Sequence, residues 1–143
     1  EDKSPDEIIE MIYENHETGL AVQTMDVDLT NADTLSYYTG LDDAEGVSQA
    51  AVSEAMIGAQ AYSLVVVRAE NPAQTQTIAQ AMRDGINQAK WICVEADDLR
   101  VVACGDVIML VMVSSQLSDT VTAQDMVDAF VAVAQQEPSV DLQ

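Results

Sequence analysis

The sequence predicts an α+β fold of two layers, in which a four-stranded, largely antiparallel sheet carries helices packed on one face. Three observations lead to this prediction. The strong apolar stretches have the length of strands, they occur in two pairs joined by turn-forming residues, and each pair is followed by a stretch of helical periodicity. The order is therefore ββα-ββα, preceded by an additional amphipathic helix at the N-terminus.

The N-terminal helix begins at a capping sequence. Residues 4–7 (SPDE) combine an N-cap serine, a proline at the first helical position and a glutamate three residues after the cap. An apolar stripe follows on one face, and residues 18–19 (TG) end the helix. Alternation over residues 25–29 then predicts an extended segment, and a capped short helix over residues 30–38 ends at Gly40.

The first strand pair covers residues 47–56 and 61–69, with a break at Gly58. The second strand of this pair contains the run LVVV, which is typical of a buried strand. Asn71 and Pro72 end it and begin the main helix, whose apolar residues recur every three or four positions as far as Cys93. We expect this helix to provide most of the packing against the sheet.

The second strand pair covers residues 99–104 and 107–113, and the dipeptide 105–106 (GD) between them is typical of a two-residue hairpin turn. Residues 107–113 are apolar at every position, which predicts a central strand covered on both sides. The first helix or the segment around Met25 would supply the second cover. A last helix begins at a cap over residues 122–125 and ends before Pro138.

Length and composition limit both the domain organisation and the partners. A chain of 143 residues, 48% of them apolar, predicts a single domain over residues 1–143, with flexible ends at 1–4 and 137–143. The 25 acidic and five basic residues give a formal net charge of −20, which excludes nucleic acid and anionic lipid surfaces as partners. Because no apolar run reaches the roughly 20 residues of a membrane span, we expect no direct membrane insertion by this chain.

Few residues are typical of an enzyme. The only histidine, His16, lies at the end of an acidic helix, where a capping or solvated role is favoured over a catalytic triad. Cys93 and Cys104 lack the spacing of a metal or redox motif, and we expect both to be free thiols. No glycine-rich phosphate loop is present. We therefore expect no catalytic residue, no cofactor and no metal.

Acidic residues suggest two alternatives to this interpretation. Asp26 and Asp28 alternate along an extended segment, which favours a solvated edge, with weak calcium binding as the alternative. An EF-hand is excluded, because its glycine position is Asn31 and its closing glutamate position is Tyr37. A pair of facing carboxylates would instead indicate a carboxylate-dependent hydrolase that acts on a cell-wall or carbohydrate substrate.

Three aromatic residues, Tyr37, Tyr38 and Trp91, are the candidates for a partner-binding surface, because amphipathic aromatic side chains anchor interfaces. The alternative for Trp91, at the predicted end of the main helix, is a place in the core. The expected partner is a protein or a cell-envelope component, and the chain itself is expected to be a monomer or a weak homo-oligomer.

Several short motifs resemble one known family. They are residues 37–42 (YYTGLD), 56–68 (MIGAQAYSLVVVR), 90–95 (KWICVE) and 105–108 (GDVI). This ordered set is similar to a family of uncharacterised lipoproteins of Gram-positive anaerobes, the domain of unknown function numbered 4358. The resemblance implies an extracytoplasmic domain, attached to the cell surface through a signal peptide and a lipid anchor, and it supplies no catalytic residue. Together with the missing catalytic set, it favours a non-enzymatic binding or interaction module.

Overall fold

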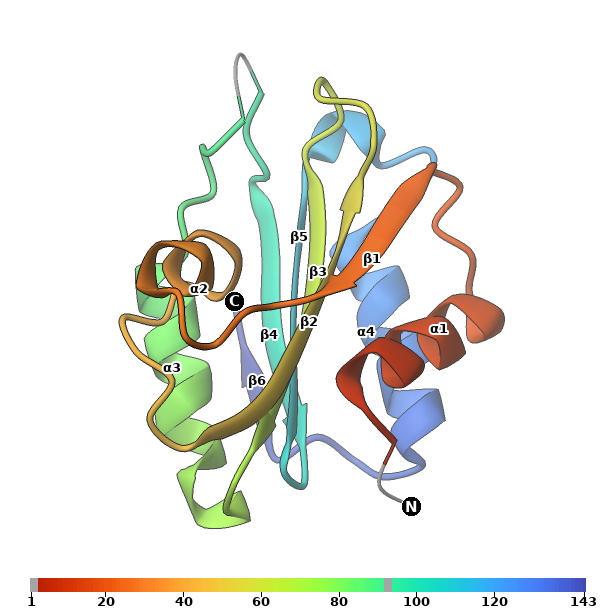
Figure 1. Ribbon diagram of the computed structural model, residues 1–143. Coiled ribbons are helices and arrows are strands. Elements are labelled where there is room, and N and C mark those ends of the chain that lie inside the picture. The colour runs from red at the N-terminus through yellow and green to blue at the C-terminus, as the bar shows by residue number, and fades with distance from the viewer. Residues whose placement is uncertain (1–2, 92–93) are drawn as a thin grey trace.

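The computed structural model describes residues 3–91 and 94–143. The described chain forms a single antiparallel sheet of six strands, in the order β1-β2-β3-β5-β4-β6, together with four α-helices (Figure 1). The predicted α+β class with one antiparallel sheet is therefore confirmed.

In chain order the elements are α1 (Pro5–Asn15), β1 (Val22–Asp26), α2 (Ala32–Thr39), β2 (Val47–Ala55), β3 (Tyr62–Ala69), α3 (Thr75–Gly85), β4 (Asp98–Cys104), β5 (Val107–Val113), α4 (Ala123–Ala134) and β6 (Val140–Leu142). Short 3-10 turns cover Pro72–Gln74 and Ser115–Leu117. None of the described helices is long and apolar enough to cross a membrane.

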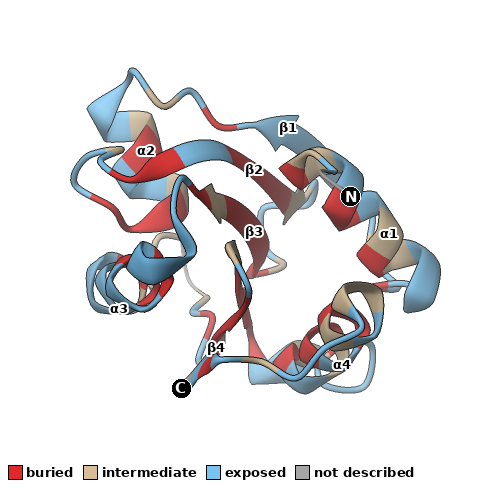
Figure 2. Cartoon of the chain, turned by 90° about the horizontal axis from the view of Figure 1, so that it is seen from below, coloured by how far each residue is buried: buried red, intermediate tan, exposed pale blue. Residues whose placement is uncertain are grey.

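Helices cover both faces of the sheet, so the prediction of two layers with helices on one face is wrong. Figure 2 shows α2 and α3 on one side of the strands and α1 and α4 on the other. Each side has its own apolar core, with Val65 of β3 pointing into the first and Leu64 into the second. Because β3 and β5 are buried at almost every position, a single helical layer would leave one apolar face in water.

The sheet has six strands where four were predicted. The central place expected for residues 107–113 is confirmed, and α1, lying beside α4, helps to cover the second face. The additional strands are the two edges. β1 lies in the predicted extended region, shifted toward the N-terminus, and β6 lies within the segment 137–143 that was expected to be a flexible end. A strand of three residues carries too short an alternation to be recognised in the sequence.

Local signals located most element boundaries. Glu7 accepts a hydrogen bond from the Ser4 backbone N–H at 2.9 Å, which completes the capping box of α1. Gly105, at φ +63°, allows the tight turn between β4 and β5. The main helix is shorter than predicted, because α3 ends at Gly85 and the chain continues in an irregular segment. Trp91 therefore lies beyond the helix.

Of the two cysteines, the structure describes only Cys104. Cys104 lies at the end of β4 as a free thiol, and burial is the main cause that raises the pKa of this group. Cys93 lies outside the described residues.

Candidate functional site: a lysine enclosed by aromatic rings

The structure brings the three predicted aromatic residues together around one lysine. Tyr37 and Tyr38 come from α2, whereas Lys90 and Trp91 follow α3. The Lys90 Nζ atom lies 4.2 Å from the ring centroid of Tyr37, 5.1 Å from that of Tyr38 and 5.2 Å from that of Trp91. These distances are within the range of cation–π attraction. We call these four residues together with Glu54 the lysine cage.

Glu54 supplies the counter-charge of the cage. Its Oε2 atom accepts a hydrogen bond of 2.6 Å from Lys90 Nζ, and the backbone carbonyl of Tyr37 accepts another of 3.2 Å. The Lys90 side chain is only 2% exposed, and that of Glu54 is 20% exposed. Burial lowers the pKa of Lys90, and the Glu54 carboxylate opposes this effect. The ammonium group is thus removed from water but has two acceptors and three rings around it.

The position of α2 depends on a close contact between two glycines. Gly40, at φ +83°, is the C-cap of α2, and a Cβ atom added to Gly85 would lie 2.0 Å from the Gly40 carbonyl oxygen. No other residue type allows the ends of α2 and α3 to approach so closely. This contact places Tyr37 and Tyr38 on the same side as the segment that follows α3.

The segment that carries Lys90 and Trp91 is held together at its base. Gln88 and Ala96 exchange two hydrogen bonds of 2.9 Å, one between the Ala96 N–H and the Gln88 carbonyl and one from the Gln88 side chain to the Ala96 carbonyl. Both cage residues lie between these two positions in the chain. Lys90 and Trp91 therefore lie on a loop with a fixed base. The sequence had predicted that Trp91 would lie at the end of the main helix.

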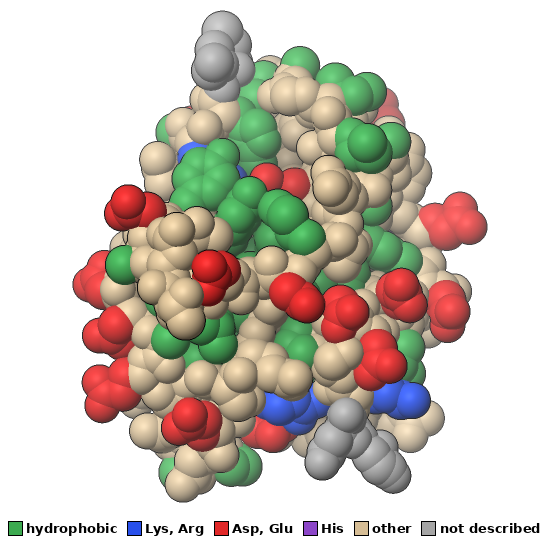
Figure 3. Space-filling view, viewed as in Figure 1, with side chains coloured by type: hydrophobic (Ala, Val, Ile, Leu, Met, Phe, Trp, Pro, Cys, Tyr) green, Lys and Arg blue, Asp and Glu red, His purple; other side chains and the backbone are tan. Residues whose placement is uncertain are grey.

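The outer side of the cage is an exposed apolar surface. The large hydrophobic residues with the greatest exposure are Met25 (39%), Tyr37 (48%), Ile57 (54%) and Met56 (65%). Figure 3 shows hydrophobic side chains gathered at and above α2, with acidic side chains spread over the rest of this face. Tyr38 meets the Tyr37 ring edge to face, with centroids 4.9 Å apart, and so supports it from one side.

Strand register places part of this apolar surface beside the cage. Gln23 of β1 lies opposite Glu54, and Met25 lies opposite Val52, two residues earlier on β2. Since directly paired residues point to the same face, Met25 and Glu54 share the face that α2 and α3 cover. Met56 extends this ladder by donating its N–H to the Ala21 carbonyl at 2.8 Å.

Nearly all basic side chains in the described chain already have partners. Arg68 pairs with Asp106 at 3.1 Å, Arg100 with Asp141 at 2.7 Å, and Lys90 with Glu54. Arg83 donates from Nε to the Gln143 carbonyl at 2.7 Å. The carboxylates that remain therefore dominate the surface potential, as the net charge of −20 requires.

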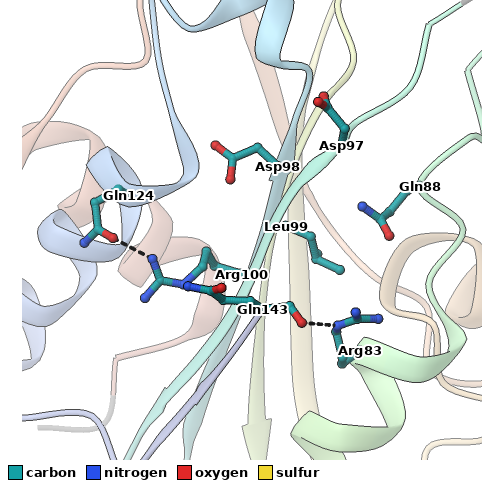
Figure 4. A pocket seen from close by; sticks show the side chains of 8 residues that line it. All are labelled: Arg83, Gln88, Asp97, Asp98, Leu99, Arg100, Gln124 and Gln143. Carbon is teal, nitrogen blue, oxygen red and sulfur yellow. Dashed lines mark hydrogen bonds between the residues drawn. The ribbon is translucent and has the colours of Figure 1, made fainter.

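Two adjacent aspartates, Asp97 and Asp98, line a pocket on the surface (Figure 4). They are the residues to consider for the carboxylate-dependent hydrolase. The Asp97 carboxylate accepts the Ser115 N–H at 2.8 Å, and the Asp98 carboxylate accepts the Ala123 N–H at 3.0 Å, at the start of α4. Figure 4 shows the two groups pointing in different directions. Hydrogen bonds from Ser115 lower the pKa of Asp97, whereas a general acid needs a raised pKa. These aspartates support the backbone.

The other predicted candidates lie apart from the cage. His16 is the C-cap residue of α1. The Asp28 carboxylate accepts hydrogen bonds from the N–H and hydroxyl of Thr30, and Asp26 ends β1. Among residues 3–91 and 94–143, no three histidine, cysteine, aspartate or glutamate side chains are grouped so that they could hold a metal ion.

Sequence reasoning identified the rings of the cage but missed Glu54. A signal for it was available, because the alternation along β2 puts Glu54 on the same face as Ala50 and Val52, which belong to the core. A carboxylate at an inward position of a strand requires a cation close by. The comparisons add no relative: no protein-family model, no curated protein and no solved structure matches this chain.

Proposed function

We propose that this chain is a non-enzymatic binding domain, and that its partner is a positively charged protein segment that docks on the outer side of the lysine cage. One observation carries the proposal. Tyr37 packs one side of its ring on the buried Lys90 ammonium and leaves about half of its surface exposed. An aromatic ring that is already fixed loses little conformational freedom on binding, which is the property of an interface anchor.

Charge decides the nature of the partner. The domain carries a net charge of −20, and the arginines and Lys90 are held by acceptors of the chain itself. A negatively charged partner would meet repulsion, whereas a basic one gains attraction and a faster association. Apolar side chains in the same partner would cover Tyr37 and Met25.

The location of the domain is part of the proposal. The resemblance of the motifs around Tyr37, Tyr38 and Trp91 to a family of surface lipoproteins supports an extracytoplasmic domain tethered to the membrane. Its partner would then be a basic protein or another basic component of the cell envelope. No observation on the described residues favours the carboxylate-dependent hydrolase.

Binding of a synthetic peptide tests the proposal. The probe is a peptide of about ten residues in which lysine and leucine alternate. The control peptide contains glutamate in place of lysine. Trp91 is the only tryptophan, so its fluorescence reports on the cage directly. We expect the basic peptide to bind, Tyr37→Ala to weaken binding by at least about tenfold, and Gln80→Ala on the exposed side of α3 to leave it unchanged.

Salt provides a second criterion, because attraction between unlike charges weakens as ionic strength rises. The affinity of the basic peptide should fall as sodium chloride is added. Equal binding of the glutamate peptide, or an affinity that Tyr37→Ala leaves unchanged, would contradict the proposed function.

A further inference from the structure

The outer edge of β1 is an open strand edge next to the apolar surface. β1 is the first strand in the sheet order and pairs only with β2. Four of its five residues are exposed, and Figure 2 shows it in the colour of exposed residues at the rim of the molecule, with no helix beyond it. In the part of the chain that the structure describes, no element pairs with this edge.

The hydrogen-bond pattern identifies the backbone groups that are open. The Val27 N–H donates to the Ala50 carbonyl, and the Ala21 carbonyl accepts from the Met56 N–H. Because bonding directions alternate along an antiparallel strand, residues 23 and 25 also bond to β2, and residues 22, 24 and 26 direct their N–H and C=O groups outward. Three of the five residues of β1 therefore offer their backbone N–H and C=O groups to a further strand.

Most of the devices that normally block a strand edge are missing from β1. Its sequence, VQTMD, contains no proline and no lysine, and its pairing with β2 shows no bulge. The opposite edge of the sheet, β6, has only three residues, one of which, Asp141, forms an ion pair with Arg100 of β4. β1 is therefore the edge suited to pairing.

The charge of the chain selects the occupant. A second copy of this domain would bring another net charge of −20 to the same edge, and the two copies would repel each other. A basic segment would instead pair its lysines or arginines with the Asp26 and Asp28 carboxylates. Apolar side chains that alternate with the basic ones would point to the face on which Met25 lies.

We propose that β1 accepts an extended, basic segment of a partner protein as a seventh strand of the sheet, with outward backbone groups of residues 22, 24 and 26 as its hydrogen-bond partners. This inference rests on the proposed function and adds the mode of recognition. Main-chain hydrogen bonds would provide affinity, and the alternation of basic and apolar side chains would provide specificity.

A backbone substitution separates strand addition from simple surface docking. Thr24→Pro removes an outward N–H group and breaks no hydrogen bond between β1 and β2. Proline is tolerated on the open side of an edge strand. Thr24→Ala is the matched control, because it changes the side chain and keeps the N–H. With the lysine–leucine peptide we expect Thr24→Pro to weaken binding by about tenfold and Thr24→Ala to have little effect.

A modified peptide keeps the test independent of whether Thr24→Pro folds. In this peptide every backbone nitrogen is methylated, so that neither of its edges can pair while charge and side chains stay the same. We expect it not to bind the wild-type domain, and we expect the unmodified peptide to slow hydrogen exchange at the amides of Thr24 and Asp26. Equal binding of both peptides, with Tyr37→Ala still weakening it, would overturn strand addition and leave the proposed function intact. Failure of the unmodified peptide to bind would overturn both.

Discussion

The Lys90 ammonium is 2.6 Å from the Glu54 carboxylate, although the two residues are 36 positions apart and the lysine side chain is almost fully buried. Removing one partner of such a pair leaves a buried charge without compensation. We expect Glu54→Gln to lower the free energy of unfolding by about 2–3 kcal/mol near neutral pH, below the full range for buried pairs because Glu54 retains some contact with water. Urea unfolding measures this loss, and Glu45→Gln, in an exposed loop, is the control.

The effect of Glu54→Gln should depend on pH. Burial lowers the pKa of Lys90 in the folded state below that in the unfolded chain, so the folded state binds fewer protons in the window between the two pKa values. Stability from this group therefore rises with pH through that window. Loss of Glu54 would lower the folded pKa further and widen the window. The difference between variant and wild type should shrink as pH rises toward about 10. A difference independent of pH would show that the lost energy is not electrostatic.

Gly85 should tolerate no side chain. A Cβ atom there would lie 2.0 Å from the Gly40 carbonyl oxygen, so Gly85→Ala must push α2 away from α3. We expect a loss of about 2–4 kcal/mol in stability and a shift of the Trp91 emission toward that of exposed tryptophan. Gly58→Ala is the control, since nothing lies within 4 Å of its added Cβ. If Gly85→Ala melted like wild type, the glycine contact would not position the cage.

The buried Tyr62, which lies beside the partly buried Tyr13, should control stability at alkaline pH. The Tyr62 hydroxyl lies 3.0 Å from that of Tyr13, which donates to Ser53 at 2.6 Å, and burial raises the pKa of Tyr62 well above 10.0. Below about pH 10 this group is neutral in both states. Above it the unfolded chain ionises first, so stability is lost as pH rises toward the folded pKa.

The Tyr62→Phe variant isolates this effect, because it keeps the buried ring and removes the hydroxyl group that ionises. We expect it to cost about 0.5–1.5 kcal/mol near neutral pH and to reduce the alkaline loss of stability. Melting as a function of pH, followed together with tyrosinate absorbance, measures both. An alkaline profile identical to that of wild type would assign the loss to other groups.

Added salt should stabilise the domain. Twenty net negative charges on one small fold repel one another, and salt screens this repulsion over a Debye length of about 10 Å at 0.1 M. We therefore expect Tm to rise between low and moderate sodium chloride, as measured by circular dichroism. A Tm that fell instead would mean that ion pairs such as Arg68–Asp106 contribute more than the repulsion removes.

Local signals predicted the elements well and their assembly less well. The capping box at Ser4 and the turn at Gly105 act within a few residues, so the sequence displays them directly. The choice between two and three layers depends on which face each helix covers, and α3 and α4 cover opposite faces. The apolar stripe of a helix is the same whichever face of the sheet it covers, so only the competition of all helices for buried area decides.

The same distinction applies to the candidate site. Tyr37, Tyr38 and Trp91 were recognisable by residue type, because aromatic rings with a polar end are typical of interfaces. That these three rings enclose Lys90 could not be predicted from the sequence. Tyr37 and Lys90 are 53 positions apart, and their contact requires α2 and α3 to meet at Gly40 and Gly85.

The sequence by itself determined the α+β class, the acidic surface and the positions of most strands and helices, because alternation, capping and charge are properties of neighbouring residues. The tertiary structure alone decided that helices cover both faces, that β1 lies at the edge of the sheet and that Glu54 faces Lys90. Each of these depends on which distant surfaces become buried together. That outcome minimises the exposed apolar area of the whole chain, and no single segment specifies it.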